Sequence, residues 1–101
     1  MKSLKERIAE DKVLLGTVVF NPLMAILAER AGFDALYLGG NTLGLAKGVI
    51  EANLNLTEMV QAGSDIRTVT DAPLLLDAAA GWGDAMHMHR TVSMSEAAGF
   101  S

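Results

Sequence analysis

Cysteine is absent from this chain of 101 residues, and proline occurs only twice. Without cysteine the chain can form no disulfide, no thiolate metal site and no cysteine nucleophile, which fits a reducing compartment. Aromatic residues are scarce as well, with one tryptophan, one tyrosine and three phenylalanines, so we expect a core of aliphatic side chains and methionine. Such a core suits helices packed on a parallel sheet.

Positive charge is also in short supply, with eight basic residues against 12 acidic ones and a net charge of -4. Because no basic stripe is present to neutralise a phosphate backbone, we expect no nucleic-acid partner. No apolar run approaches the ~20 residues that span a membrane. The amphipathic segment from Met1 to Arg7 lacks the apolar centre of a signal peptide. We therefore predict a cytoplasmic protein without a membrane partner.

The local pattern predicts one helix followed by three strand-helix units. Capping residues and apolar periodicity indicate helices over residues 4–11, 22–31 and 84–98, and a further helix whose start is framed by Asn55 and Glu58 and which continues over 59–70. Strands are expected over 13–20 and 35–38 and from Pro73 onward. The segment that follows Gly39-Gly40-Asn41, up to Asn53, is long for a strand-to-helix connection and is expected to be a functional or mobile loop.

The unit pattern predicts an α/β fold. Crossover units of this kind build parallel sheets or barrels, and three of them leave an open edge. The triplet Ala31-Gly32-Phe33 closes a helix just before a strand and recurs as Ala98-Gly99-Phe100, so the chain stops where a fourth strand is expected to begin. No linker divides residues 1–101, which we take as a single partial domain.

The first candidate for chemistry is Asp77, which follows the apolar run Leu74-Leu75-Leu76 and precedes a glycine-rich turn. A buried parallel strand that ends in one carboxylate delivers an acid to the edge of the sheet where ligands bind. Alternatively, Asp77 only accepts N–H bonds within the turn. Gly39-Gly40-Asn41 ends the second strand in a turn whose backbone amides can face the same ligand.

Several blocks of the chain, in this order, resemble the N-terminal part of the isocitrate lyase/phosphoenolpyruvate mutase superfamily. These blocks are Ala31-Gly32-Phe33-Asp34-Ala35-Leu36-Tyr37-Leu38-Gly39-Gly40, Leu56-Thr57-Glu58-Met59-Val60, Pro73-Leu74-Leu75-Leu76-Asp77, Gly81-Trp82-Gly83-Asp84 and Arg90-Thr91-Val92. The resemblance implies the first three or so βα units of a modified (β/α)8 barrel of the TIM type, not closed within this chain.

The resemblance also implies a function. Members bind Mg²⁺ and make or break C–C or P–C bonds next to a 2-oxo acid, so we expect a lyase that acts on a small di- or tricarboxylate, or a phosphonate, through an Mg²⁺-stabilised enolate. The general acid or base is expected beyond residue 101, which would leave this segment inactive alone. The full-length protein is expected to be a homo-oligomer.

Carried over residue by residue, the resemblance places Tyr37, Gly39 and Gly40 beside the substrate, with Tyr37 in a catalytic role. Most members have serine at the position of Gly39, so one hydroxyl contact is missing here. Asn41 and Trp82 complete the expected substrate-binding set, Trp82 as a wall of the pocket or a filler of the barrel mouth. The alternative for Tyr37 is a packed strand residue whose hydroxyl reaches solvent.

The expected metal ligands are Asp77, which is also a catalytic candidate, and Glu51. Asp77 corresponds to the first carboxylate of the family's Asp-x-Asp strand end, and Ala79 stands where the second would be. Because Mg²⁺ keeps most of its waters, carboxylates at this position can act through bound water. Glu51 is the nearest match to an acid in the loop after the second strand, and a solvated loop glutamate is the alternative.

Two other functions stay open from the sequence. One is an aldolase of the ketopantoate hydroxymethyltransferase or citrate-lyase β-subunit type, which shares the approach to the second strand. The other is a non-catalytic binding or assembly fragment, which the missing carboxylate at Ala79 favours. His87 and His89 do not suggest a metal site, because a spacing of two places them on opposite faces of a helix.

Overall fold

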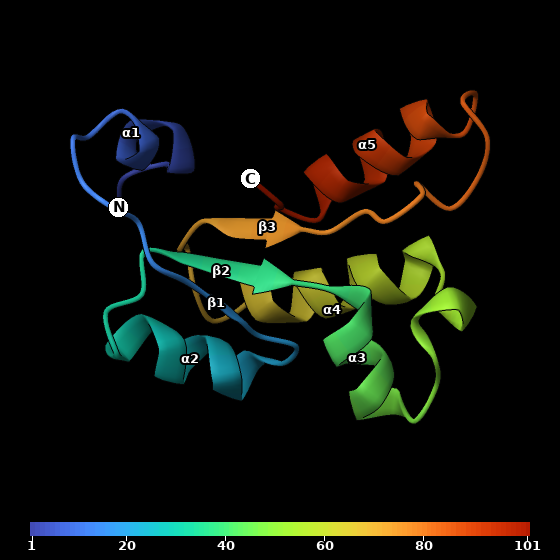
Figure 1. The fold of residues 1–101 in the computed structure, drawn as a ribbon, viewed down its shortest axis with the longest axis horizontal. Coiled ribbons are helices and arrows are strands. Elements are labelled where there is room, and N and C mark those ends of the chain that lie inside the picture. The colour runs from blue at the N-terminus through green and yellow to red at the C-terminus, as the bar shows by residue number, and fades with distance from the viewer.

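The computed structural model describes residues 1–101 and contains one sheet of three parallel strands (Figure 1). The strands are β1 (Gly16–Val18), β2 (Ala35–Leu38) and β3 (Leu74–Leu76), adjacent in chain order. The register places Thr17 beside Leu36 and Leu36 beside Leu74. The expected α/β class is confirmed. Closure into a barrel stays a prediction.

Helices precede and connect the strands. They are α1 (Leu4–Ile8), α2 (Pro22–Arg30), α3 (Gly40–Lys47), the short 3-10 helix η1 (Glu51–Asn53), α4 (Leu56–Arg67) and α5 (Met88–Ala97). Along the sheet, α2 contacts α4 and α4 contacts α5. None of these helices is long and apolar enough to cross a membrane.

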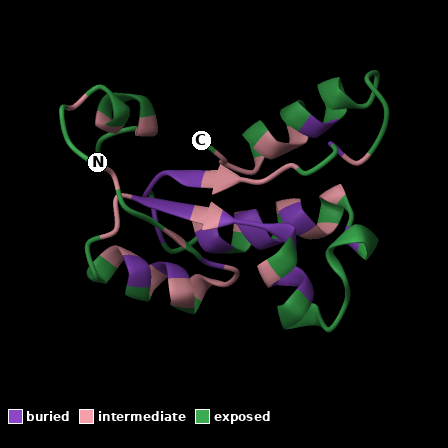
Figure 2. Ribbon diagram, in the orientation of Figure 1, coloured by how far each residue is buried: buried purple, intermediate pink, exposed green.

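One face of the sheet is buried and the other is more open, because successive strand side chains point to opposite faces. Leu36 and Leu74 share the buried face and are fully inaccessible, in one cluster with Ala25 of α2 and Met59 of α4. Val18 lies on the opposite, more open face and is 39% exposed. Figure 2 shows the same division, with burial concentrated where the strands meet the helices.

Three predicted helix starts are confirmed by their capping bonds. Ser3, Asn21 and Asn55 each accept a bond from the backbone N–H three residues further on. At α4 the side chain of Glu58 also returns to the Asn55 N–H, which completes a capping box.

The helix predicted over residues 59–70 ends earlier, at Arg67, and the one over 4–11 ends at Ile8. In α1 no residue is buried, so no packing extends the helix into the charged residues that follow. The helix predicted over 84–98 begins only at Met88. Asp84 does cap, but it caps the turn before α5, by accepting from the N–H groups of Met86 and His87.

The first strand is also shorter than the predicted span of 13–20 and covers Gly16–Val18. Its pairing nevertheless extends further, since the Asp34 N–H donates to the Leu15 carbonyl at 2.7 Å and the Val19 N–H donates to the Tyr37 carbonyl at 2.9 Å. At the other edge of the sheet, the Ser101 N–H donates to the Leu74 carbonyl at 2.8 Å. Ser101 therefore lies beside β3, where a fourth strand was predicted to start.

The prediction of a turn at Gly39-Gly40-Asn41 and a long loop from there to Asn53 is wrong. This segment contains α3 and η1. Glycine disfavours helix, and α3 includes Gly40 and Gly44. The helix ends at Lys47 and is capped by Gly48, whose φ of 72° is left-handed. Gly44 is nevertheless needed for packing, because a Cβ atom there would lie 2.6 Å from the Val49 carbonyl oxygen.

Candidate active site

Tyr37 and Asp77 meet at the carboxyl end of the sheet. Tyr37 pairs in register with Leu75, two residues before Asp77, so the side chains of Tyr37 and Asp77 both lie on the more open face. The Tyr37 hydroxyl donates to Asp77 Oδ2 at 2.6 Å, and the Ala79 N–H donates to Asp77 Oδ1 at 2.9 Å. The carboxylate is thus held from two sides by its own chain.

These hydrogen bonds change the pKa values of Asp77 and Tyr37. The Tyr37 hydroxyl, followed by the Ala79 N–H, lowers the pKa of Asp77, because both donors stabilise the charged carboxylate. The same hydrogen bond raises the pKa of Tyr37, and burial and the negative charges of Asp77 and Glu51 add to the effect. The pair therefore consists of a carboxylate and a neutral phenol near neutral pH.

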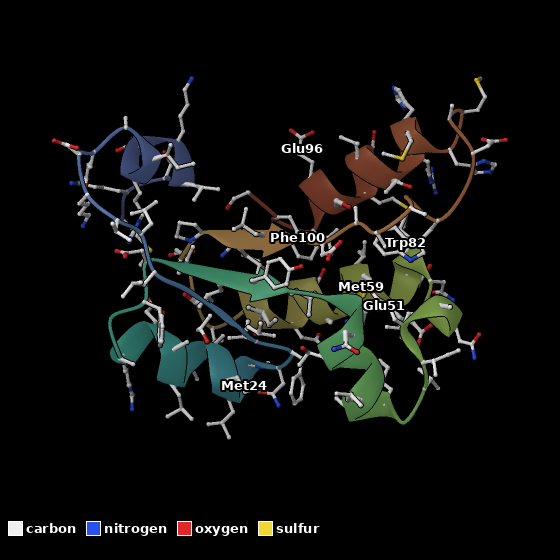
Figure 3. All side chains as sticks on the ribbon, viewed as in Figure 1. Met24, Glu51, Met59, Trp82, Glu96 and Phe100 are labelled. Carbon is white, nitrogen blue, oxygen red and sulfur yellow. The ribbon has the colours of Figure 1, made fainter.

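Glu51, at the start of η1, is the second carboxylate of the site. Its side chain lies against the backbone of Gly40, where a Cβ atom would stand 3.0 Å from Glu51 Oε1. Figure 3 shows Glu51 and Trp82 together beyond the carboxyl ends of β2 and β3. The structure thus brings the carboxylate of Glu51 to the same end of the sheet as Tyr37 and Asp77.

The start of α3 lies directly after β2, and sequence reasoning missed it. Gly39 is the N-cap, and the first intrahelical bond runs from the Leu43 N–H to the Gly39 carbonyl. The preceding amides of Gly40, Asn41 and Thr42 have no partner inside the helix, and the helix dipole makes this end attractive to anions. Gly40 is buried and Asn41 is exposed.

The connection after β3 is held in an unusual backbone conformation. Ala79 and Trp82 both have positive φ, 46° and 60°, which side-chain-bearing residues rarely adopt. Thr91 of α5 donates from Oγ1 to the Gly81 carbonyl at 2.7 Å and ties the connection to the helix. Trp82 is half-buried and packs against the core cluster, so its ring also contributes to the fold.

The donor set suits a hard cation. Asp77 and Glu51 offer carboxylate oxygens, and Mg²⁺ is usually bound through one or two carboxylates, substrate oxygens and water. No three carboxylate, imidazole or thiol side chains of the chain gather around a common point. The set therefore fits a metal that leaves most of its coordination to water and substrate, and not an all-protein cage.

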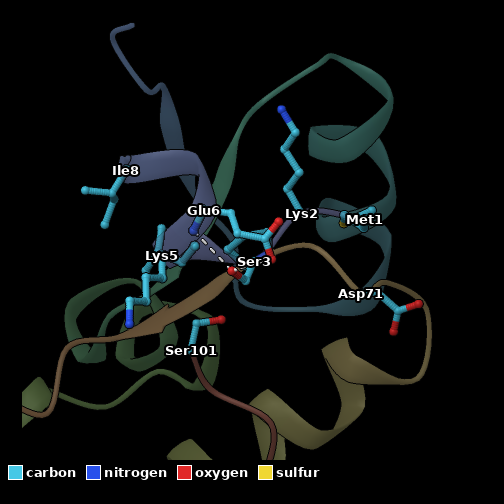
Figure 4. Close-up of a pocket in the computed structure, with 10 residues that line it drawn as sticks. Met1, Lys2, Ser3, Lys5, Glu6, Ile8, Asp71 and Ser101 are labelled. Carbon is cyan, nitrogen blue, oxygen red and sulfur yellow. Dashed lines mark hydrogen bonds between the residues drawn. The ribbon is translucent and has the colours of Figure 1, made fainter. Parts of the chain in front are cut away.

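A cavity of about 630 Å³ lies elsewhere, beside α1 and the residues that lead into β3 (Figure 4). Its lining includes Lys5, Asp71 and Ser101. Asp71 precedes β3 and Asp77 follows it, so this cavity is at the amino end of the strands. It contains none of the predicted site residues.

Comparison with known proteins places the chain. The family model described as phosphoenolpyruvate phosphomutase matches residues 4–101. Among curated proteins, 2-methylisocitrate lyase of Aeropyrum pernix is 37% identical over 97 residues, which cover 95% of this chain and 32% of that protein.

Two solved structures are similar as well. A phosphoenolpyruvate phosphomutase from Streptomyces platensis subsp. rosaceus has a TM-score of 0.92 at 28% identity and covers 96% of this chain and 34% of its own. Phosphonopyruvate hydrolase in complex with oxalate and Mg²⁺ has a TM-score of 0.84 at 32% identity and covers 88% of this chain and 32% of its own. The chain therefore spans about a third of the length of the relatives it matches.

Proposed function

Because this chain belongs to the phosphoenolpyruvate phosphomutase family, we propose that it supplies the first βα units of an Mg²⁺-dependent carbon–carbon bond lyase. The proposed substrate is a small di- or tricarboxylate. The observation that carries the proposal is the 2.6 Å bond between Tyr37 and Asp77 at the carboxyl end of adjacent parallel strands. That edge is where α/β proteins place their ligands, and Asp77 offers it an oriented carboxylate.

In this proposal Asp77 and Glu51 hold Mg²⁺, directly or through water. When bound, the cation supplies positive charge that stabilises negative charge developing on substrate oxygens. The relative solved with oxalate and Mg²⁺ supports this pairing of metal and carboxylate ligand. Asp77 remains ionised for this role, because the hydrogen bond from Tyr37 lowers its pKa.

The substrate carboxylate is proposed to bind at the start of α3. The free N–H groups of Gly40 and Asn41 donate to its oxygens, and the helix dipole adds attraction. Trp82 borders the same end of the sheet (Figure 3), and its half-buried ring would form a wall of this site. Proton transfer in the retro-aldol cleavage is assigned to residues of the whole protein beyond those of this chain.

Cleavage of a P–C bond in a phosphonate is the second candidate. It is favoured by the likeness to phosphonopyruvate hydrolase, with 32% identity and a TM-score of 0.84. The two functions differ in their products, because a phosphonate hydrolase releases inorganic phosphate and a carbon–carbon lyase releases two smaller carboxylic acids. Product analysis on 2-methylisocitrate and phosphonopyruvate separates them.

The test of the site is Asp77→Asn in the whole protein. We expect activity to fall by about 100-fold or more, with little change in stability, because the variant removes the charge that faces the cation. Asp84→Asn is the matched control, since Asp84 follows the same strand but its side chain is 71% exposed and pairs with His87. Activity in Asp77→Asn equal to that of the control would leave Asp77 with only its role in the turn.

A further inference from the structure

Gly39 leaves space that the Tyr37 ring uses. Its backbone angles, φ -120° and ψ 151°, are extended and open to any residue, so the conformation does not require glycine. A Cβ atom at this position would lie 2.9 Å from Tyr37 Cε1, and carbon atoms pack at roughly 3.5–4.0 Å. The ring of Tyr37 therefore lies against bare backbone.

Gly40 leaves space that the Glu51 side chain uses. A Cβ atom at Gly40 would lie 2.8 Å from Glu51 Cγ, so the Glu51 side chain occupies the volume that a side chain at residue 40 would need. The two glycines are consecutive and stand where β2 passes into α3. Together they make room for one phenol and one carboxylate at the candidate site.

The position of the Tyr37 ring decides how Asp77 is held. With the ring against Gly39, the hydroxyl reaches Asp77 Oδ2, while Oδ1 accepts from the Ala79 N–H. One bond on each oxygen sets the orientation of the carboxylate plane. A carboxylate has about four lone-pair sites, so lone pairs remain on both oxygens for a ligand.

We propose that Tyr37 is a positioning residue that orients the Asp77 carboxylate, and that Gly39 and Gly40 permit this by leaving room for the Tyr37 ring and the Glu51 side chain. The contact itself follows from the geometry, whereas its purpose, a carboxylate set for a cation, rests on the function proposed above. The two parts need separate measurements.

The contact is tested through the ring of Tyr37, the only tyrosine of residues 1–101, in the whole protein. With isotope-labelled tyrosine rings, the NMR signals that disappear in Tyr37→Phe belong to Tyr37. We expect Gly39→Ala and Asp77→Asn each to shift these signals, and Asp77→Asn to add nothing once Gly39→Ala is present, because the contact is already lost. Gly16→Ala is the control, since a Cβ there meets nothing closer than 3.4 Å. Ring signals unchanged by Gly39→Ala would overturn the proposal.

The purpose is tested by calorimetric titration with Mg²⁺. Gly39→Ala and Tyr37→Phe are expected to weaken Mg²⁺ binding by roughly 10-fold to 100-fold, the usual effect of removing a partner that orients a metal ligand. Tyr37→Phe adds no atom, so it keeps the test valid if Gly39→Ala does not fold. Gly16→Ala should bind as the wild type does.

The outcomes distinguish the two ideas. Equal Mg²⁺ affinity in wild type, Tyr37→Phe and Gly39→Ala would refute the positioning role. If the whole wild-type protein binds no Mg²⁺ while the ring signals respond as expected, the contact is supported and the proposed function is wrong. If Gly39→Ala, Asp77→Asn and Tyr37→Phe all respond as described, both the positioning role and the proposed function are supported.

Discussion

The bond between Tyr37 and Asp77 should make the free energy of unfolding depend on pH in the acidic range. Since the Tyr37 hydroxyl lowers the pKa of Asp77, Tyr37→Phe should raise that pKa toward the ordinary value of 3.8. A carboxylate with a lowered folded pKa stabilises the fold above its unfolded pKa and loses that contribution as pH falls through the folded pKa. Urea unfolding of wild type and Tyr37→Phe should therefore differ at neutral pH and converge once Asp77 is protonated.

The control for this prediction is a second carboxylate. The pKa of Asp84 is lowered by His87, which lies outside the Tyr37 contact. An NMR titration that follows both side chains should show the pKa of Asp77 rising in Tyr37→Phe while that of Asp84 stays in place. An unchanged pKa of Asp77 in Tyr37→Phe would mean that the Tyr37 hydroxyl does not bond the carboxylate in solution.

Ala79 allows a test of charge at the same strand end. Its φ of 46° lies in the left-handed region, where asparagine and aspartate are tolerated better than alanine. Ala79→Asp should therefore fold and should tighten Mg²⁺ by about 10-fold, because a second negative charge near the cation adds attraction. Ala79→Asn has the same shape without the charge and should leave Mg²⁺ affinity unchanged. Equal Mg²⁺ affinities in the two variants would mean that no cation binds at this strand end.

Between elements, Gly63 decides how closely α4 and α5 approach. A Cβ atom at Gly63 would lie 2.3 Å from the ring of Phe100, which follows α5. Gly63→Ala should gain about 1 kcal/mol in helix propensity but lose roughly 1–3 kcal/mol to overpacking. We expect net destabilisation, measured by urea unfolding.

Ser64→Ala, one residue further along α4, is the matched control and should change the unfolding free energy by less than about 0.5 kcal/mol. Phe100→Leu should reduce the cost of Gly63→Ala, because a smaller side chain leaves the space open. A stabilised Gly63→Ala variant would show that the two helices do not pack as described.

For the molecule as a whole, the open sheet predicts association. The outer edge of β1 is unpaired, and that of β3 is bonded only by Ser101 at Leu74. Several large apolar side chains also lie outside the core, including Leu23 at 63% and Ile50 at 68% exposure. We expect the isolated chain to self-associate in sedimentation experiments. Val18→Lys, on the exposed face of β1, should reduce this association because an edge lysine opposes strand pairing.

Val13→Lys adds the same charge outside the sheet, at a residue that is 83% exposed, and controls for net charge alone. If Val13→Lys disperses the chain as well as Val18→Lys does, strand pairing is not the cause. A monodisperse wild-type monomer with a sharp thermal transition would contradict the prediction altogether.

Local chemistry was enough to predict much of this fold. The caps Ser3, Asn21 and Asn55 mark helix starts because each side chain bonds an amide three residues on, a contact within one turn. The order of strands and helices follows from apolar runs between such caps. Asp77 could be identified for the same reason, since its place at a strand end depends only on neighbouring residues.

What depends on contacts distant in sequence could not be predicted. The glycines of α3 locally disfavour a helix, and only the packed structure shows that Glu51 and Val49, which follow the helix, lie against Gly40 and Gly44. The bond between Tyr37 and Asp77 joins residues 40 positions apart and exists because β2 and β3 pair in one register. Periodicity and capping carry no information about that register, so only the packed sheet determines which side chain orients the carboxylate.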